Sequence, residues 1–334
     1  MALRIVFMGT AELACASLKA LIEEPGFEVL AAVTQPDRPA GRDLKPQPSA
    51  VKKLAVAKNL SVLQPERARE PGFIDQLCAL APDLIVVAAY GQILPKAILE
   101  LPRFGCVNVH TSLLPKYRGA APIQWAIING DPQTGVTIMQ VAPALDSGDI
   151  LSQCVTPIAP DDNAETLHDR LAQLGAQLLV PTLHDYVAGK ITPRPQVESE
   201  ASHVGKISKE DGRLDWSQPA TSLWNRVRAF TPWPGAYAFQ AAEPKPRLLK
   251  IWQARVETDL SGAPGEILTS GKEGIVVACG AGSLRILILQ REGGRRMNAA
   301  EFLTGNSMKR GELLNRRTGE SGGLLEEWQD KNLT

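Results

Sequence analysis

Residues 105–122 read GCVNVHTSLLPKYRGAAP, a stretch that begins as a buried strand and stops at Pro115. In an extended chain, side chains two residues apart point to the same face, so we expect Asn108 and His110 to face one space. That space is expected beyond the carboxyl end of the strand, where open α/β sheets bind their ligands. The same spacing also fits a structural role, with His110 as a partly buried, hydrogen-bonded residue and Asn108 as a turn cap.

Short apolar runs alternate with helical patterns over residues 1–189, which predicts a doubly wound, mainly parallel α/β sheet. Amphipathic helices are expected between the strands, and a long one is expected over 163–188, where leucines recur on one stripe. The expected strands occupy residues 3–8, 29–34, 84–89, 106–110, 135–141 and 150–158.

Residues 190–207 are rich in proline, serine and charge and show no sustained period, so we expect an interdomain linker there. One helix near 219–230 and a series of short strands separated by glycines then predict a small antiparallel barrel. The expected division is a Rossmann-like domain at 1–189, the linker at 190–207, a barrel domain at 208–318 and a surface tail at 319–334.

Composition narrows the class of protein. The 334 residues are 44% apolar and 22% charged, which is enough to bury a sizeable core in a globular protein of two domains. The first residues run directly into a strand pattern without a signal peptide, and no apolar run approaches the roughly 18 to 20 residues of a membrane helix. The five cysteines are scattered and never spaced as CxxC, so we expect a reducing cytoplasm as the location.

Several chemistries lack their motifs. The first strand is followed by FMGTAELA instead of GxGxxG, and there is no Walker A sequence, so the sheet does not imply a dinucleotide or a P-loop. The four histidines lie far apart without an HExxH pattern, so we expect no metal site. No GxSxG elbow offers a serine nucleophile.

A second polar stretch, ALDSGDIL at residues 144–151, places Asp146 between two strand patterns and just before Gly148. Asp, Ser and Gly are also the residues that ordinary turns use. Together with Asn108 and His110, however, Asp146 would complete an acyl-transfer site without a covalent intermediate. Such a site must take a proton from an amine, stabilise an oxyanion and protonate the leaving nitrogen.

At this point the motifs resemble a known family. NVHTSLLPKYRGAAPIQWAI, TGVTIMQV and LDSGDIL, in this order, resemble the folate-dependent formyltransferases, whose signature is Asn-x-His followed by Ser-Leu-Leu-Pro and a later Asp. The stretches FMGTAELA, TQPDRPAGRDLKPQPSAVK, KISKEDGRLDW and RAFTPWPGAY extend the resemblance over nearly the whole chain. They resemble the members that formylate initiator tRNA. The resemblance therefore implies formyl transfer from 10-formyltetrahydrofolate to the methionine amino group of initiator methionyl-tRNA, in translation initiation.

The resemblance also implies roles for individual residues. It makes Asn108, His110 and Asp146 the catalytic set: Asn108 and a protonated His110 would hold the formyl oxygen, and Asp146 would orient His110 and help move protons through a water. The implied folate-binding residues are Ser112, Leu113, Leu114 and Pro115, with Gly91, Ile93 and Leu94 lining the pterin pocket.

The tRNA-facing residues implied by the resemblance are Arg42, in the loop 36–49, and Lys206, in the linker. That loop departs from the family, which commonly has Gly-Lys-Lys after Gly-Arg, whereas this chain has Asp43-Leu44-Lys45. Charge patterning adds a basic stretch at 285–317, with eight basic residues against three acidic ones and a net charge of +5. Taken alone, this basic stretch is interpreted as a solvent-exposed face. With the resemblance, we interpret it as a groove for the tRNA backbone and choose Arg295 and Arg296 as its phosphate contacts.

Two alternative functions share parts of this pattern. A sugar-nucleotide formyltransferase would have the same polar core, the Ser-Leu-Leu-Pro run and even Trp-Pro-Gly, but no use for the basic loop. A folate-binding or RNA-binding module without chemistry would be expected to lack at least one of the three polar residues. We expect no membrane association and see no sign of an obligate protein partner.

Overall fold

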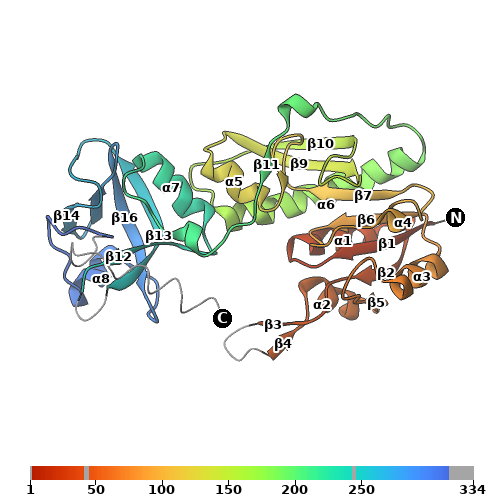
Figure 1. The fold of residues 1–334 in the computed structure, drawn as a ribbon, viewed down its shortest axis with the longest axis horizontal. Coiled ribbons are helices and arrows are strands. Elements are labelled where there is room, and N and C mark those ends of the chain that lie inside the picture. The colour runs from red at the N-terminus through yellow and green to blue at the C-terminus, as the bar shows by residue number, and fades with distance from the viewer. Residues whose placement is uncertain (1, 41–44, 243–245, 316–334) are drawn as a thin grey trace. The chain divides into compact units, whose positions relative to one another are not determined.

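The computed structural model describes residues 2–40, 45–242 and 246–315, and the chain divides into two compact units, Met1–Ile207 and Ser208–Thr334 (Figure 1). Arg42, Asp43 and Leu44 lie outside the described residues, as does the expected tail at 319–334.

The first unit is built on a seven-stranded sheet in the order β10-β9-β7-β6-β1-β2-β5. Every neighbouring pair from β5 to β7 is parallel, which confirms the mainly parallel α/β fold. Strand β9 alone runs against its neighbours β7 and β10, and the loop after β9 joins it to β10 as a hairpin. The strands are β1 (Leu3–Gly9), β2 (Phe27–Val33), β5 (Val62–Leu63), β6 (Leu84–Ala88), β7 (Cys106–His110), β9 (Gln133–Gln140) and β10 (Ile150–Pro157).

Helices cover both faces of this sheet (Figure 1). One face carries α1 (Leu13–Glu23), α2 (Ala50–Ala57), α5 (Pro122–Ile128) and α6 (Ala164–Val187), and the other carries α3 (Pro71–Leu80) and α4 (Lys96–Leu99). Alternate residues of β1 divide between the faces, so that Val6 and Met8 pack in one core cluster with Phe73 and Leu77 of α3. Burial on both faces explains why these strands read as nearly continuous apolar runs.

Short strands that the sequence did not predict complete the first unit. Strand β3 (Arg38–Ala40) pairs antiparallel with β4 (Lys45–Gln47), and β8 (Arg118–Gly119) pairs in parallel with β11 (His203–Val204). Arg194 forms a further backbone bridge with Ile150. The segment 190–207, which includes the short helix η1 (Glu198–Glu200), is therefore hydrogen-bonded to the first unit at several points.

The second unit contains an antiparallel sheet in the order β12-β13-β16-β15-β14, as the sequence predicted for this region, with β17 paired to β16. Helix α7 packs on β13 and β16. The elements are η2 (Glu210–Gly212), α7 (Ala220–Ala229), β12 (Ala236–Gln240), β13 (Arg247–Glu257), β14 (Ile267–Gly271), β15 (Gly274–Ala278), β16 (Ser283–Arg291), β17 (Met297–Asn298) and α8 (Ala299–Gly305).

Residues 311–315 join the two edges of this sheet into a barrel. Leu314 bridges to Gln240 at the end of β12, and Leu313 bridges to Glu266 just before β14. The Asn315 side chain accepts a hydrogen bond from the Phe239 amide and donates one to the Leu214 carbonyl. Joining both edges in this way leaves fewer unpaired backbone groups than an open sheet would have.

Among the described helices, none is both long enough and apolar enough to cross a membrane.

Candidate active site

Strand β7 places the first two polar residues at the carboxyl edge of the sheet. It lies between β6 and β9, where Asn108 is opposite Val87 on one side and Met139 on the other. Asn108 and His110 occupy alternate positions of the same strand and therefore share a face. His110 is 7% exposed, whereas Asn108 is only half-buried. Within the described part of the chain, the Asn108 carboxamide has no hydrogen-bond partner, so its N–H groups are open to a ligand.

The imidazole of His110 lies between two oxygen atoms. Its Nε2 is 3.0 Å from the Tyr117 carbonyl, to which it donates, and its Nδ1 is 3.7 Å from Oδ2 of Asp146. The Nε2 contact is a hydrogen bond, whereas the separation of Nδ1 and Oδ2 is that of an ion pair with a protonated ring. The structure thus brings His110 and Asp146 together, although 36 positions separate them in the sequence.

Asp146 lies in the loop between β9 and β10, in a left-handed conformation with φ of +49°. Asp adopts this conformation more readily than most residues. Its side chain is 13% exposed, and Oδ2 accepts a hydrogen bond of 2.8 Å from the Gly119 amide. Next to it, a Cβ atom at Gly148 would lie 1.8 Å from the Gln140 carbonyl oxygen, so only glycine fits at that point of the loop.

One further residue that the sequence analysis missed, Gln196, binds this loop and is in turn held by Arg118. Gln196 donates from Nε2 to the carbonyls of Asp146 and Gly148, each at 2.8 Å, and its Oε1 accepts from Nε of Arg118 at 3.0 Å. The Arg118 side chain is 4% exposed and pairs with Glu198 at 2.9 Å, an interaction that holds the pKa of the Glu198 carboxyl below its usual range. Gln196 and Glu198 belong to the segment read as a linker, so no sequence signal pointed to them.

The segment Ser112–Pro115, expected to border the folate, is held from within the fold. The Ser112 side chain is fully buried and donates to the Lys116 carbonyl, and Leu114 is 3% exposed. Thr137 of β9 donates to the Ser112 carbonyl and accepts from the Leu114 amide. Leu113 and Pro115 are half-buried, so they are the two side chains of this segment that a ligand can reach.

The residues expected to line the pterin pocket follow β6, beside the carboxyl end of β7. Gly91 has φ of +81°, and a Cβ there would lie 2.6 Å from the Gln35 amide nitrogen, which donates to the Tyr90 carbonyl. Leu94 is 7% exposed and packs in the core, whereas Ile93 is 80% exposed. Of the three, Ile93 offers the most accessible apolar surface.

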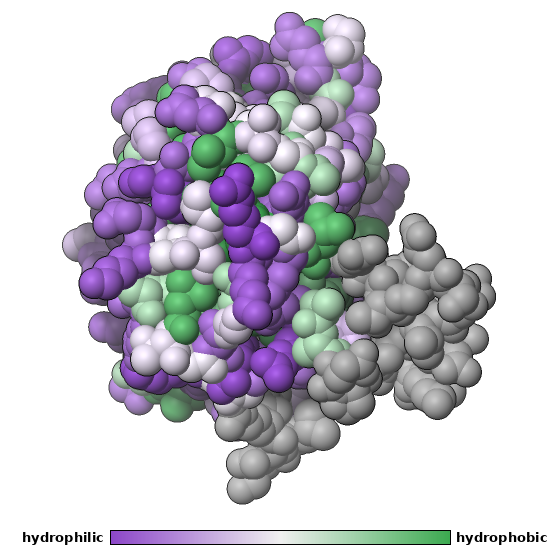
Figure 2. All heavy atoms as spheres, turned by 90° about the vertical axis from the view of Figure 1, so that its left-hand side faces the viewer, coloured by the Kyte–Doolittle hydropathy of each residue, from purple (hydrophilic) through white to green (hydrophobic). Residues whose placement is uncertain are grey.

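The expected tRNA contacts lie in three places. Lys206 is exposed and follows Gly205, whose carbonyl accepts a hydrogen bond from the Trp125 indole, while Arg42 lies outside the described residues. In the second unit, Arg295 is exposed and pairs with Glu301, and the Arg296 guanidinium lies 3.6 Å from the centre of the Trp252 ring. The face of the second unit turned to the viewer in Figure 2 is mostly hydrophilic, with hydrophobic residues in small separate groups.

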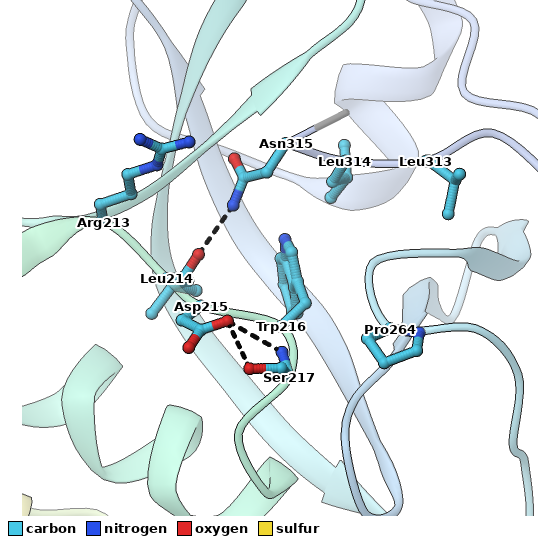
Figure 3. A pocket seen from close by; sticks show the side chains of 9 residues that line it. All are labelled: Arg213, Leu214, Asp215, Trp216, Ser217, Pro264, Leu313, Leu314 and Asn315. Atoms are coloured by element: carbon cyan, nitrogen blue, oxygen red, sulfur yellow. Dashed lines mark hydrogen bonds between the residues drawn. The ribbon is translucent and has the colours of Figure 1, made fainter. Parts of the chain in front are cut away.

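Two pockets have linings that do not include Asn108, His110 or Asp146. One, in the first unit, is lined by Tyr117 and Trp125 among others, so it adjoins the carbonyl that binds His110. The other, in the second unit, is lined by Asp215, Trp216 and Asn315 (Figure 3) and contains none of the expected site residues. There Asp215 accepts hydrogen bonds from the amide and hydroxyl of Ser217, which lower the pKa of the Asp215 carboxyl.

Comparison with known proteins identifies the family. Residues 3–183 match the formyl transferase family model, and residues 206–307 match the model of the formyl transferase C-terminal domain. The chain is 49% identical to methionyl-tRNA formyltransferase of Citrifermentans bemidjiense, over 96% of this chain and 99% of that protein. It is also 49% identical to methionyl-tRNA formyltransferase of Caldanaerobacter subterraneus, over 93% of this chain and 100% of that protein.

A solved structure shares the fold at much lower sequence identity. The sugar 3N-formyl transferase WlaRD, crystallised in the presence of dTDP and 5-N-formyl-THF, is 18% identical to this chain. It superposes with a TM-score of 0.62 over 87% of this chain and 98% of its own. The family models and the close relatives together confirm the resemblance seen in the motifs: the chain belongs to the formyl transferase family, among the methionyl-tRNA formyltransferases.

Proposed function

We propose that this protein transfers a formyl group from 10-formyltetrahydrofolate to the amino group of methionine on initiator methionyl-tRNA, for translation initiation. The observation that carries the proposal is the 49% sequence identity to methionyl-tRNA formyltransferases over nearly the whole chain. The arrangement of Asn108, His110 and Asp146 at one edge of the sheet supports it. Catalytic roles for these three residues are part of the proposal.

In this reaction the amine nitrogen attacks the formyl carbon, and the bond between that carbon and N10 of the folate then breaks. The attacking nitrogen loses a proton and N10 gains one, so no net acid or base is consumed. The open carboxamide of Asn108 is suited to donate to the formyl oxygen as negative charge develops on it. His110 is suited to move the proton, and its Nε2–H must leave the Tyr117 carbonyl before it can donate to the substrate.

Asp146 has a supporting role in this proposal. Its carboxylate lies beside Nδ1 of His110, where it fixes the orientation of the ring and stabilises the positive charge when the ring takes up a proton. Gly91, Ile93, Leu94 and the segment Ser112–Pro115 are proposed to bind the folate. Among them, the exposed Ile93 and the half-buried Leu113 and Pro115 are the side chains available for contact.

A competition assay tests the function. Purified protein receives 10-formyltetrahydrofolate with initiator methionyl-tRNA and an amino-sugar nucleotide side by side, and formylated products are measured separately. We expect product only on the methionyl-tRNA. Formylation of the sugar nucleotide alone would instead establish a sugar-nucleotide formyltransferase, the activity in the name of WlaRD, which shares the fold.

We propose that the basic residues of the second unit bind the tRNA backbone. The Arg296 guanidinium lies over the Trp252 ring and Arg295 is exposed, whereas Arg285 is only 15% exposed and donates to Glu257. That hydrogen bond holds the pKa of the Glu257 carboxyl below its usual range. Arg285 is therefore a poor phosphate ligand, and Arg295 and Arg296 are the better ones. Lys206 and Arg42 are proposed to meet the acceptor end of the tRNA.

Replacing Arg295 and Arg296 together with Ala is expected to weaken binding about equally for initiator and elongator methionyl-tRNA. Loss of two phosphate contacts should reduce the slope of log K against log salt concentration by about 1 to 2, because fewer counterions are released. Binding is measured across a salt series. The control replaces Lys19 and Lys96, which also pair with glutamates, and should leave the slope unchanged. An unchanged slope in the arginine variant would show that both residues lie on a solvent-exposed face and make no phosphate contact.

The cytoplasmic location stays a prediction that rests on the scattered cysteines. Burial raises the pKa of Cys106 and Cys279 to about 12, so both thiols are protonated at neutral pH.

No group of three or more metal-binding side chains occurs among the described residues.

A further inference from the structure

We infer that Gln196 is a positioning residue that holds Asp146 in place for the reaction, an inference that rests on the proposed function of the His110–Asp146 pair. Gln196 touches neither the imidazole nor the Asp146 carboxylate. It acts on the backbone that carries the carboxylate, through the carbonyls of Asp146 and Gly148.

The side chain of Gln196 brackets the loop at two points, one on each side of Ser147. Both hydrogen bonds are 2.8 Å long and both use the same Nε2 amide nitrogen. Asp146, whose carbonyl is the first of these points, has the left-handed conformation that Asp tolerates better than most residues. The Gln196 amide is thus an external contact that holds the backbone on both sides of Ser147.

The orientation of the Gln196 amide is itself fixed by Arg118. A guanidinium has donors only, so Arg118 must face the oxygen of the amide, and the NH₂ group is left for the two carbonyls. The buried guanidinium is in turn held by the Glu198 carboxylate through two contacts, at 3.1 Å and 2.9 Å. The chain of contacts therefore has only one consistent assignment of donors and acceptors.

Strand β8, which contains Arg118, also holds the carboxylate of Asp146. Gly119, next to Arg118 in β8, donates its amide to Oδ2 of Asp146, and β8 is paired with β11. The backbone of Asp146 is reached through Arg118 and Gln196, and its carboxylate is reached through Gly119. Together these contacts place Oδ2 at 3.7 Å from His110 Nδ1, and small displacements of a catalytic group are costly to the rate.

The test uses Gln196→Glu. This change keeps the size of the side chain and an acceptor for Arg118, but it removes the donor that the two carbonyls require. We expect kcat for formyl transfer to fall about 10- to 100-fold, with KM for both substrates within about twofold of wild type. If Gln196 serves only to pair with Arg118, Gln196→Glu will keep wild-type kcat, and the inference is overturned.

Two companion variants complete the design. Gln196→Ala places no negative charge beside the carbonyls and should lower kcat in the same way, so it decides the matter if Gln196→Glu does not fold. Arg194→Ala is the matched control, because Arg194 lies two residues away and makes one side-chain hydrogen bond of 3.0 Å, to Gln153. The Arg194 variant should keep the wild-type kcat. An equal loss of kcat in this control would show that any change in the segment lowers kcat, and would overturn the specific role of Gln196.

A readout independent of activity is hydrogen exchange at the Gly119 amide, which reports the position of the Asp146 carboxylate. It should exchange faster in both Gln196 variants and at the wild-type rate in the Arg194 variant. Unchanged protection together with reduced kcat would overturn the inference. If wild-type protein forms no formyl-methionyl-tRNA, the proposed function fails, while the exchange measurement still decides whether Gln196 holds Asp146.

Discussion

Replacing His110 with Ala, or Asp146 with Asn, is expected to lower the turnover number for formyl transfer by about 10² to 10⁴-fold. The Ala variant removes the group that moves the proton. The Asn variant keeps the shape and can still accept the Gly119 hydrogen bond, but it loses the charge beside His110 Nδ1. Asn also tolerates the left-handed conformation at this position, so the fold should survive.

Single-turnover rates and thermal unfolding of each variant measure these two effects separately. Asp149→Asn is the control, because Asp149 lies in the same loop and its contact with Gln140 uses the backbone carbonyl only. We expect that control to stay close to wild type. Turnover above about a tenth of wild type in either main variant would remove that residue from the catalytic set.

Gly148→Ala is expected to be the most damaging small substitution in the first unit. The added Cβ would lie 1.8 Å from the Gln140 carbonyl oxygen and 2.7 Å from its carbon, and both are backbone atoms that no side-chain rotation can move aside. We expect a loss of about 3 kcal/mol or more in the free energy of unfolding, measured by denaturant titration. Formyl transfer should fall with it, because Asp146 is two residues away.

Gly72→Ala is the matched control for this change. Gly72 lies in helix α3, and a Cβ there meets no heavy atom within 4 Å. Because Ala costs less conformational entropy than Gly in a helix, this variant should gain up to about 1 kcal/mol in stability. Wild-type stability in Gly148→Ala would show that the loop relaxes freely, contrary to the close contact in the structure.

The backbone fold was largely predictable because burial leaves a local pattern. Strands β1, β6 and β7 appear as apolar runs of the expected position, and helix α6 occupies most of the expected 163–188. The pieces that escaped prediction are short. Strands β8 and β11 have two residues each, and residues 311–315 close the barrel, so none of them has enough length to show a period.

The sequence by itself determined that Asn108 and His110 share a face, since side-chain alternation along a strand is a local property. It determined the family as well, through motifs in the right order. Only the tertiary structure decided that Asp146 lies 3.7 Å from His110. Only the structure showed that Gln196, in a segment without any period, binds the Asp146 loop directly while Arg118 orients its amide. The reason is physical: a buried guanidinium and a bracketed loop are satisfied by partners about 80 and 50 residues away, and hydrogen bonds across such distances leave no trace in local sequence.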